Sequence, residues 1–322
     1  MSETVLKDAH GRVMDYLRLA ITDRCNLRCV YCMPEDDNEP AHIMSFPRIE
    51  RIIRVAGSLG VKKLKITGGE PLVHPEVTQI IRLAKNSSQI ANVTLTTNGL
   101  LLATLAADLI DAGLDAVNVS LDTLDPARFE ALTRRDYLPR VLAGLSRVLD
   151  KPGKLSVKVN CVPTASSPIK DLMSLAALAK DHDLHVRFIE LMPIGLGKGQ
   201  ERLDPEILQK ELAQAFGPLT PVSRTLGNGP ATYYALEGFK GRIGFINAVK
   251  SCFCDRCNRI RITADGCFKT CLHMDRGLFL PLDDEAAMAR AMIEAVYKKP
   301  LSHSFTKEAE AADERIMSRI GG

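Results

Sequence analysis

Short runs of β-branched and apolar residues alternate with longer stretches of helical period over the first two thirds of this 322-residue chain. Six such runs lie at residues 16–22, 62–67, 92–97, 116–121, 155–162 and 185–191. Helical stretches lie at residues 47–59, 100–112, 139–149, 168–180 and 205–216. Because strands that alternate with helices form repeated βα units, the pattern predicts an α/β fold around a parallel sheet.

The pattern changes near Gly217. Short alternating runs separated by tight turns follow, at residues 232–236, 242–249, 259–263 and 268–272. Alternation with a period of two predicts a smaller antiparallel β-rich layer, and the sequence then predicts a helix over residues 283–298 and a polar tail. We therefore expect one domain over residues 1–217 and a second over residues 218–322.

Composition argues against two classes of partner. With 42 Lys and Arg against 39 Asp and Glu, the net charge is only +3, which does not indicate a nucleic-acid-binding surface. No apolar run reaches the length of a membrane span, and the first eight residues lack the apolar core of a signal peptide. Eight of the nine cysteines lie in two groups, at 25–32 and 252–271, which favours metal binding in a reducing, cytoplasmic setting.

Cations stand inside four of the expected strands. They are Arg18, Lys63, Lys65, Lys158 and Arg187. Parallel strands are buried on both faces, and a buried charge is costly unless it meets an opposite charge. Any one of these side chains can be a strand-start residue that reaches solvent, but five together favour a shared polyanionic ligand.

Polar residues gather at the other ends of the same strands. They lie at residues 67–71, 96–99, 120–122 and 190–193, and at Asn160. Barrel and wound-sheet enzymes keep their active sites at the carboxyl ends of their strands. We therefore expect the chemistry of this chain to take place at that end of the sheet.

The cysteines form two sets of three. The first set is Cys25, Cys29 and Cys32, and the second is Cys254, Cys257 and Cys271. A four-iron cluster or a structural zinc ion normally takes four protein ligands, so each trio leaves one metal position open to a small molecule. The second trio can also belong to a zinc ribbon, with Cys252 or Cys267 as a fourth ligand. Cys161, inside a strand, is most simply a small buried apolar residue.

The first trio has the spacing C-x3-C-x2-C, and a Gly68-Gly69-Glu70-Pro71 turn ends the next strand. This arrangement resembles the radical S-adenosylmethionine (SAM) superfamily. The resemblance extends to the GTP 3′,8-cyclase family, also called molybdenum cofactor biosynthesis protein A. The segments that carry it are residues 16–18, 22–26, 67–71, 96–99, 120–122, 254–261, 263–266, 271–272 and 299–300, with His303 and the terminal 321–322.

The resemblance implies a fold and two cofactors. The fold is a partial (βα)6 TIM-type barrel whose opening is covered by the C-terminal layer. The first trio would hold a [4Fe-4S] cluster whose open iron binds SAM, and reductive cleavage of SAM yields a 5′-deoxyadenosyl radical. The second trio would hold another [4Fe-4S] cluster, whose open iron binds the guanine of GTP.

The resemblance also implies roles for individual residues. The SAM contacts are Tyr31, Gly69, Ser120 and Met192. The GTP contacts are Arg18, Lys63, Lys65, Thr96, Lys158, Arg187, Arg259, Ile260 and Arg261. Arg259, Arg261 and the terminal Gly321 and Gly322 are implied to act in catalysis. At the position of Lys65 the family often has arginine, so the charge is kept but the two-pronged contact is not.

We therefore expect a GTP 3′,8-cyclase that forms (8S)-3′,8-cyclo-7,8-dihydroguanosine 5′-triphosphate in molybdenum cofactor biosynthesis. By family analogy it is a homodimer, takes electrons from a donor and passes its product to cyclic pyranopterin monophosphate synthase. One alternative is another radical SAM enzyme with an auxiliary cluster, acting on a peptide or a different nucleotide. Another is a zinc-stabilised scaffold or nucleic-acid-binding module.

Overall fold

The computed structural model describes residues 5–36, 39–150, 153, 155–223, 226–227, 229–274, 277–303 and 316–321. At its centre, six parallel strands follow one another in chain order. They are β1 (Tyr16–Ala20), β2 (Lys63–Thr67), β3 (Asn92–Thr97), β4 (Ala116–Ser120), β5 (Ser156–Cys161) and β6 (Leu184–Ile189). All six were expected from the sequence, and their ends differ from the expected ones by no more than two residues.

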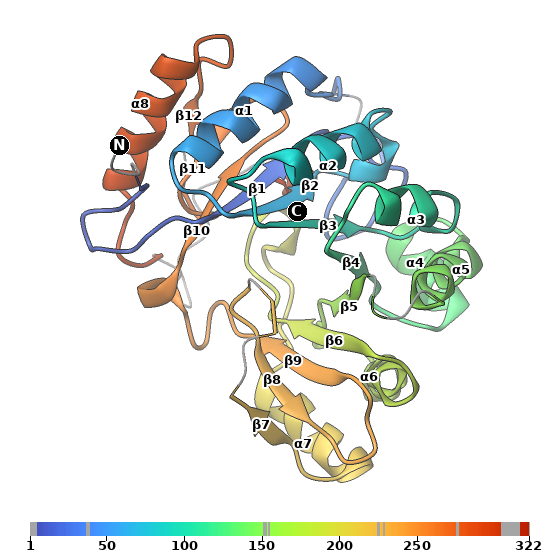
Figure 1. Ribbon diagram of the computed structural model, residues 1–322. Coiled ribbons are helices and arrows are strands. Elements are labelled where there is room, and N and C mark those ends of the chain that lie inside the picture. Colours follow the sequence, from blue (N-terminus) through green and yellow to red (C-terminus); the bar gives the residue numbers. More distant parts are fainter. Residues whose placement is uncertain are drawn as a thin grey trace.

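The strands form a curved, open wall with helices along its outer face (Figure 1). The helices are α1 (Phe46–Ser58), α2 (Val77–Asn86), α3 (Leu102–Asp111), α4 (Pro126–Thr133), α5 (Leu138–Leu149), α6 (Ile169–Asp181), α7 (Pro205–Phe216) and α8 (Glu285–Tyr297). Short 3-10 turns are η1 (Pro71–Val73), η2 (Gly195–Gly197), η3 (Cys254–Arg256) and η4 (Met317–Arg319). The wall is open, as in a partial barrel, because in the described part of the chain its two end strands do not pair with each other.

The C-terminal strands differ from the expected separate layer. They are β7 (Thr220–Val222), β8 (Thr232–Ala235), β9 (Arg242–Ile246), β10 (Arg259–Ile262), β11 (Cys267–Lys269) and β12 (Leu278–Phe279). The expected antiparallel pairings are present, but β9 runs parallel to β6 and β10 runs parallel to β1. Both edges of the central sheet are thereby extended, which satisfies backbone groups that an edge strand leaves unpaired. A domain boundary at residue 217 therefore stays a prediction.

The two faces of the strands differ in chemistry. On β1, Leu17 and Leu19 are fully buried against the helices, where Ile49 and Ile52 of α1 complete the same core. Full burial of each such side chain contributes about 1.5–3 kcal/mol. The alternate positions, such as Arg18, face the concave side of the wall, because side chains alternate along a strand. In the described residues no helix is long and apolar enough to cross a membrane.

Helix α2 was not among the elements expected from the sequence. It buries Val77, Ile80, Ile81 and Ala84, which is the spacing of an amphipathic helix. The period was therefore present in the sequence. Helix α4, also missed, is short and buries only Phe129 and Thr133, so it carries little periodic signal.

Candidate functional site

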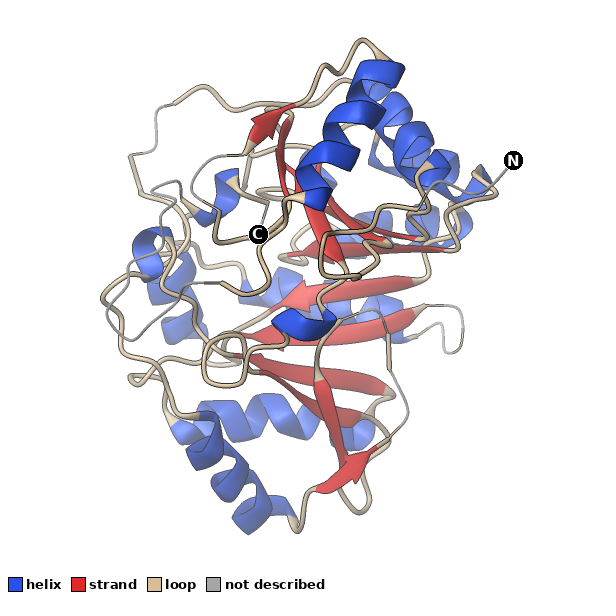
Figure 2. Cartoon of the chain, turned by 90° about the vertical axis from the view of Figure 1, so that its left-hand side faces the viewer, coloured by secondary structure: helices blue, strands red, loops and turns tan. Residues whose placement is uncertain are grey.

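One cavity of about 760 Å³ lies on the concave side of the wall, among the loops seen in Figure 2. All six cysteines of the two trios line it, although the trios are more than 220 residues apart in the sequence. Six of the seven expected cations line it as well, and so do Thr96 and Ile260. The cavity therefore brings together most of the residues singled out in the sequence, at a size suited to small-molecule ligands.

The loop that carries Cys25, Cys29 and Cys32 follows β1 and rests on the Gly68-Gly69 turn after β2. Gly69 donates its N–H to the carbonyl oxygen of Thr22 at 2.8 Å, and a Cβ on Gly69 would lie 2.5 Å from the carbonyl oxygen of Arg24. Only glycine permits so close an approach of the two backbones. The paired glycines thus hold the cysteine loop against the barrel.

Polar contacts fix the surroundings of this trio. The Tyr31 hydroxyl donates to Oδ2 of Asp122 at 2.6 Å, and Oδ1 of Asp122 accepts the N–H of Val162 at 2.8 Å. Burial raises the pKa of both Tyr31 and Asp122. The expected SAM contacts Tyr31, Gly69, Ser120 and Met192 all line the cavity.

Burial keeps the cysteines of the first trio as neutral thiols unless a cationic group binds them. Burial raises the pKa of Cys25 to about 11 and that of Cys32 to about 12, and neighbouring acids and thiolates add to the rise at Cys29. Three thiolates can share this space only when a positive group neutralises them, which an iron-sulfur cluster does.

The spacing of the sulfurs separates a cluster from a single zinc ion. Four tetrahedral ligands around one zinc lie roughly 3.5 Å apart. Among the described residues, one group of three or more His, Cys, Asp or Glu ligand atoms lies within 4.8 Å of one another, and it is neither trio. In each trio at least two sulfurs therefore lie more than 4.8 Å apart, a spread that a four-iron cluster accommodates.

Two buried cations hold the second trio. Arg12, paired with Asp8 at 2.6 Å, donates to the carbonyl oxygens of Cys254 and Leu301 at 2.5 and 2.8 Å. Lys299 is 3% exposed, and its ammonium group donates to the carbonyl oxygens of Arg259 and Thr270 and lies 3.5 Å from the Cys257 sulfur. Each cysteine of the trio, or its immediate neighbour, is thus bonded to Arg12 or Lys299.

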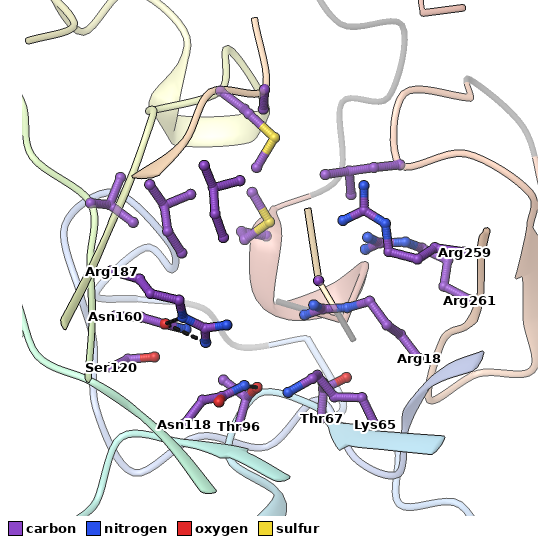
Figure 3. A pocket seen from close by; sticks show the side chains of 18 of the residues that line it. Arg18, Lys65, Thr67, Thr96, Asn118, Ser120, Asn160, Arg187, Arg259 and Arg261 are labelled. Atoms are coloured by element: carbon purple, nitrogen blue, oxygen red, sulfur yellow. Dashed lines mark hydrogen bonds between the residues drawn. The ribbon is translucent and has the colours of Figure 1, made fainter. Parts of the chain in front are cut away.

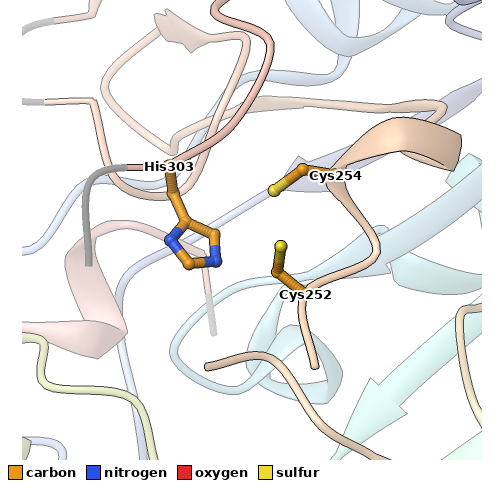
Figure 4. A group of neighbouring side chains, drawn as sticks. All are labelled: Cys252, Cys254 and His303. Atoms are coloured by element: carbon orange, nitrogen blue, oxygen red, sulfur yellow. The ribbon is translucent and has the colours of Figure 1, made fainter. Parts of the chain in front are cut away.

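The remaining cysteines differ in position. Cys252 is exposed, and its sulfur lies close to Cys254 and His303 (Figure 4). Cys267 is 2% exposed within β11, and Cys161 is 1% exposed within β5. Cys161 therefore has the buried place expected of a small apolar residue.

The cations face one another across the cavity. Arg18, Arg259 and Arg261 approach from one side and Arg187 from the other (Figure 3). Arg187 donates twice to Oδ1 of Asn160, at 2.8 and 2.6 Å, and Arg259 stacks on Phe253 with 4.5 Å between the guanidinium carbon and the ring centroid. Neither contact neutralises the positive charge, because the amide and the ring are both uncharged.

The mutual repulsion of these groups shows in their pKa values. Burial and then Arg187, Arg18 and Lys158 lower the pKa of Lys65 well below its usual value. Burial and Arg187 lower the pKa of Lys158 to about 8. Burial and the nearby arginines lower the pKa of Arg261 to about 9. A polyanion placed among them would relieve both the burial cost and the repulsion.

Lys63 is the expected GTP contact that the structure places elsewhere. Its ammonium group donates to Oδ2 of Asp15 at 2.9 Å, its side chain is 30% exposed, and it is absent from the cavity lining. Lys63 begins β2, so it reaches solvent and a carboxylate, as the strand-start alternative describes.

The carbonyl oxygens of Ile320 and Gly321 accept hydrogen bonds from side chains that line the same cavity. Arg261 donates to the carbonyl oxygen of Ile320 at 3.0 Å, and Arg18 and the Thr67 hydroxyl donate to that of Gly321 at 3.4 and 3.3 Å. Gly321 has φ +82, and a Cβ on it would lie 3.2 Å from the Ala20 Cβ. Gly322, also expected at the site, lies outside the described residues.

Replacement of Gly321 by alanine should lower 5′-deoxyadenosine formation at least about tenfold, because the tail can no longer seat against β1 and Arg18. SAM cleavage by the reduced protein measures this. Gly199→Ala is the matched control, since Gly199 has a similar φ of +76 but open space around its missing Cβ. Equal losses in both variants would mean that the contact at Gly321 is unimportant.

The sequence assigns no site role to Arg12, Lys299 or Asn118, whereas Asn160 is among the polar residues at the strand ends. Asn118 donates to the Thr96 hydroxyl at 3.4 Å and lines the cavity with Asn160. A polar residue in mid-strand is a usable signal for Asn118, since the same signal marks the cations. Nothing local marks Arg12 as an anchor of the second trio, because the carbonyl oxygens to which it donates lie more than 240 residues away.

Comparison with known proteins accords with this geometry. Residues 19–182 match the family model of the Radical SAM superfamily, and residues 184–305 match that of Molybdenum Cofactor Synthesis C. The GTP 3′,8-cyclase of Clostridium perfringens (strain 13 / Type A) is 40% identical, over 98% of this chain and all of that protein. The chain belongs to the GTP 3′,8-cyclase family of radical SAM proteins. The family member from Syntrophomonas wolfei is 39% identical over 98% of the chain and 99% of its own length.

Solved structures show the same fold. The crystal structure of Streptococcus suis SuiB bound to S-adenosylmethionine superposes with a TM-score of 0.63 at 16% identity, covering 91% of this chain and 68% of that one. The structure of native anSMEcpe with bound AdoMet superposes with a TM-score of 0.62 at 16% identity, covering 91% of this chain and 82% of that one. At such low identity the likeness concerns the fold alone.

Proposed function

We propose that this chain is a radical SAM lyase that converts GTP into (8S)-3′,8-cyclo-7,8-dihydroguanosine 5′-triphosphate, a step of molybdenum cofactor biosynthesis. The observation that carries the proposal is that two cysteine trios and a group of buried cations line one cavity. One trio suits the cluster that cleaves SAM, the other suits a cluster that binds the base, and the cations suit a triphosphate.

When bound, the first cluster and SAM supply the radical that removes the hydrogen from C3′ of GTP. C3′ then bonds to C8 of guanine, and one electron and one proton complete the dihydro product. The protein holds C3′ and C8 within bonding distance and keeps water away. Tyr31, Gly69, Ser120 and Met192 would place SAM, and the cations other than Lys63 would place the triphosphate.

GTP labelled with deuterium at C3′ tests this function. The reduced protein, with SAM and without oxygen, should transfer the deuterium to 5′-deoxyadenosine and form the cyclised nucleotide. Formation of unlabelled 5′-deoxyadenosine at a rate independent of GTP would contradict the proposal. Activity on a peptide but not on GTP would support the other radical SAM alternative.

GTP affinity should fall as the pH rises above about 8, because Lys158 then loses its proton and its charge. One such group weakens binding by up to about tenfold per pH unit. Binding titrations between pH 7.5 and 9.5 measure this. Lys158→Arg, which stays charged, should flatten the profile, whereas the exposed Lys170→Arg should not. Identical slopes for wild type and Lys158→Arg would count against a role for Lys158.

The remaining partners are inferences from the family. We infer a cytoplasmic homodimer that takes electrons from a donor and hands its product to cyclic pyranopterin monophosphate synthase. The reducing setting is supported by the grouping of eight of the nine cysteines at residues 25–32 and 252–271, which suits metal binding rather than disulfides. Size determination of the anaerobic protein, with and without that synthase, tests both associations.

A further inference from the structure

Cys252, Cys254 and His303 form a compact group at the rim of the second trio. Their three ligand atoms lie within 4.8 Å of one another (Figure 4). Zinc with sulfur and imidazole ligands needs spacings of roughly 3.5 Å, which small side-chain rotations supply. This group has the spacing of a single ion, whereas the two trios are wider.

Several contacts hold the three residues together. The Cys254 sulfur accepts the backbone N–H of His303 and is hydrogen bonded to the thiol of Cys252. Nε2 of His303 donates to the carbonyl oxygen of Ala248 at 3.0 Å, and its ring stacks on His273 with 4.8 Å between centroids. The imidazole is therefore oriented by neighbours outside the group, as ligand histidines usually are.

Arg12 joins the two segments that carry the group. Its guanidinium donates to the carbonyl oxygens of Cys254, Pro300 and Leu301 at 2.5, 2.6 and 2.8 Å. The C-x-C segment and the segment before His303 are thus bonded to one buried side chain. Because Cys252 is exposed, an ion can reach the group from solvent.

We propose that Cys252, Cys254 and His303 bind a single divalent cation with an affinity for sulfur and imidazole, Zn²⁺ being the chemically fitting ion. Water or a small ligand takes the fourth position. Cys254 cannot ligate this ion and an iron cluster at once, so ion binding and assembly of the second cluster exclude each other. The mutual exclusion rests on the proposed function, because it requires a second iron-sulfur cluster. The ion site itself does not.

Co²⁺ is a suitable probe, because its absorption reports thiolate ligands and tetrahedral geometry. The full chain is prepared free of clusters, with Cys25, Cys29 and Cys32 changed to alanine so that the first trio cannot bind. We expect one equivalent of Co²⁺ to bind with a tetrahedral spectrum. Cys252→Ser and His303→Gln should each weaken binding at least tenfold.

Cys257→Ser and Cys271→Ser are the matched controls, since these cysteines belong to the second trio but not to the proposed site. They should keep the cobalt spectrum. Loss of binding in them, with retention in Cys252→Ser and His303→Gln, would overturn the proposal, as would failure of the parent chain to bind cobalt. Circular dichroism of each variant checks that the fold is intact.

Iron uptake tests separately whether ion binding and assembly of the second cluster exclude each other. Protein with an intact first trio, loaded with Zn²⁺ before cluster assembly, should take up about half the iron of the untreated protein, and Cys252→Ser should restore full uptake. Full iron uptake by the zinc-loaded wild type would refute this mutual exclusion. The existence of the ion site is tested by the cobalt experiment alone. Neither result depends on turnover of GTP.

Discussion

Replacement of Cys29 by alanine should lower 5′-deoxyadenosine formation by a factor of at least about one thousand. Cys29 lies in the centre of the first trio, in the loop that rests on Gly69, and its sulfur lines the cavity. With two thiolates left, the site cannot hold the four-iron cluster that would bind SAM and supply the electron for its cleavage. Iron analysis of the anaerobic protein should give about half the wild-type content.

Cys161→Ala is the matched control for this variant. Cys161 is a buried cysteine on the same barrel, and its thiol makes only a 3.7 Å contact with the carbonyl oxygen of Asp122. Its removal should cost about 1 kcal/mol of stability and leave the iron content unchanged. Full SAM cleavage by Cys29→Ala, or equal iron loss in both variants, would contradict the assignment of the first trio.

Replacement of Lys299 by methionine should remove the second cluster and spare the first. Its ammonium group bonds the carbonyl oxygens of Arg259 and Thr270 at 2.7 and 2.6 Å, so the change leaves both oxygens buried without that donor. Each loss costs about 1–3 kcal/mol, and the segments that carry Cys257 and Cys271 lose their common anchor. We expect at least a tenfold fall in occupancy of the second cluster, measured by paramagnetic resonance of the reduced protein.

Lys298→Met is the control, because Lys298 precedes Lys299 but is exposed. Lys299→Arg should retain part of the occupancy. Any second cluster that remains in Lys299→Met should have a more negative reduction potential, since a positive charge and an N–H near the Cys257 sulfur are gone. An unchanged potential with full occupancy would show that Lys299 does not support the cluster.

The central fold could be read from the sequence because its signal is local. Each run such as 92–97 is a buried strand with its own β-branched pattern, and the helix between strands carries a period of 3.6. The way in which β9 and β10 extend the sheet is not local. Their parallel pairing with β6 and β1 depends on which strands lie at the edges of the central sheet, and an alternating run alone does not reveal its neighbour.

The candidate site could be predicted because buried strands rarely contain charged side chains. Lys65, Lys158 and Arg187 were marked because a charge in a strand needs a partner, and the structure gathers them around one cavity. The same signal marked Lys63, whose partner is the surface carboxylate of Asp15. The charge pattern alone does not distinguish a strand cation that lines the cavity from one that pairs with a surface carboxylate. The anchors Arg12 and Lys299 lie outside the strands, so only the three-dimensional contacts reveal them.

The most direct test of the account is the paramagnetic resonance spectrum of the reduced protein, recorded without oxygen, before and after addition of GTP. The account predicts signals from two clusters, with GTP altering the signal that Cys257→Ser removes and leaving unchanged the one that Cys29→Ala removes. A single cluster in the wild type, or a GTP effect confined to the cluster held by Cys29, would contradict it.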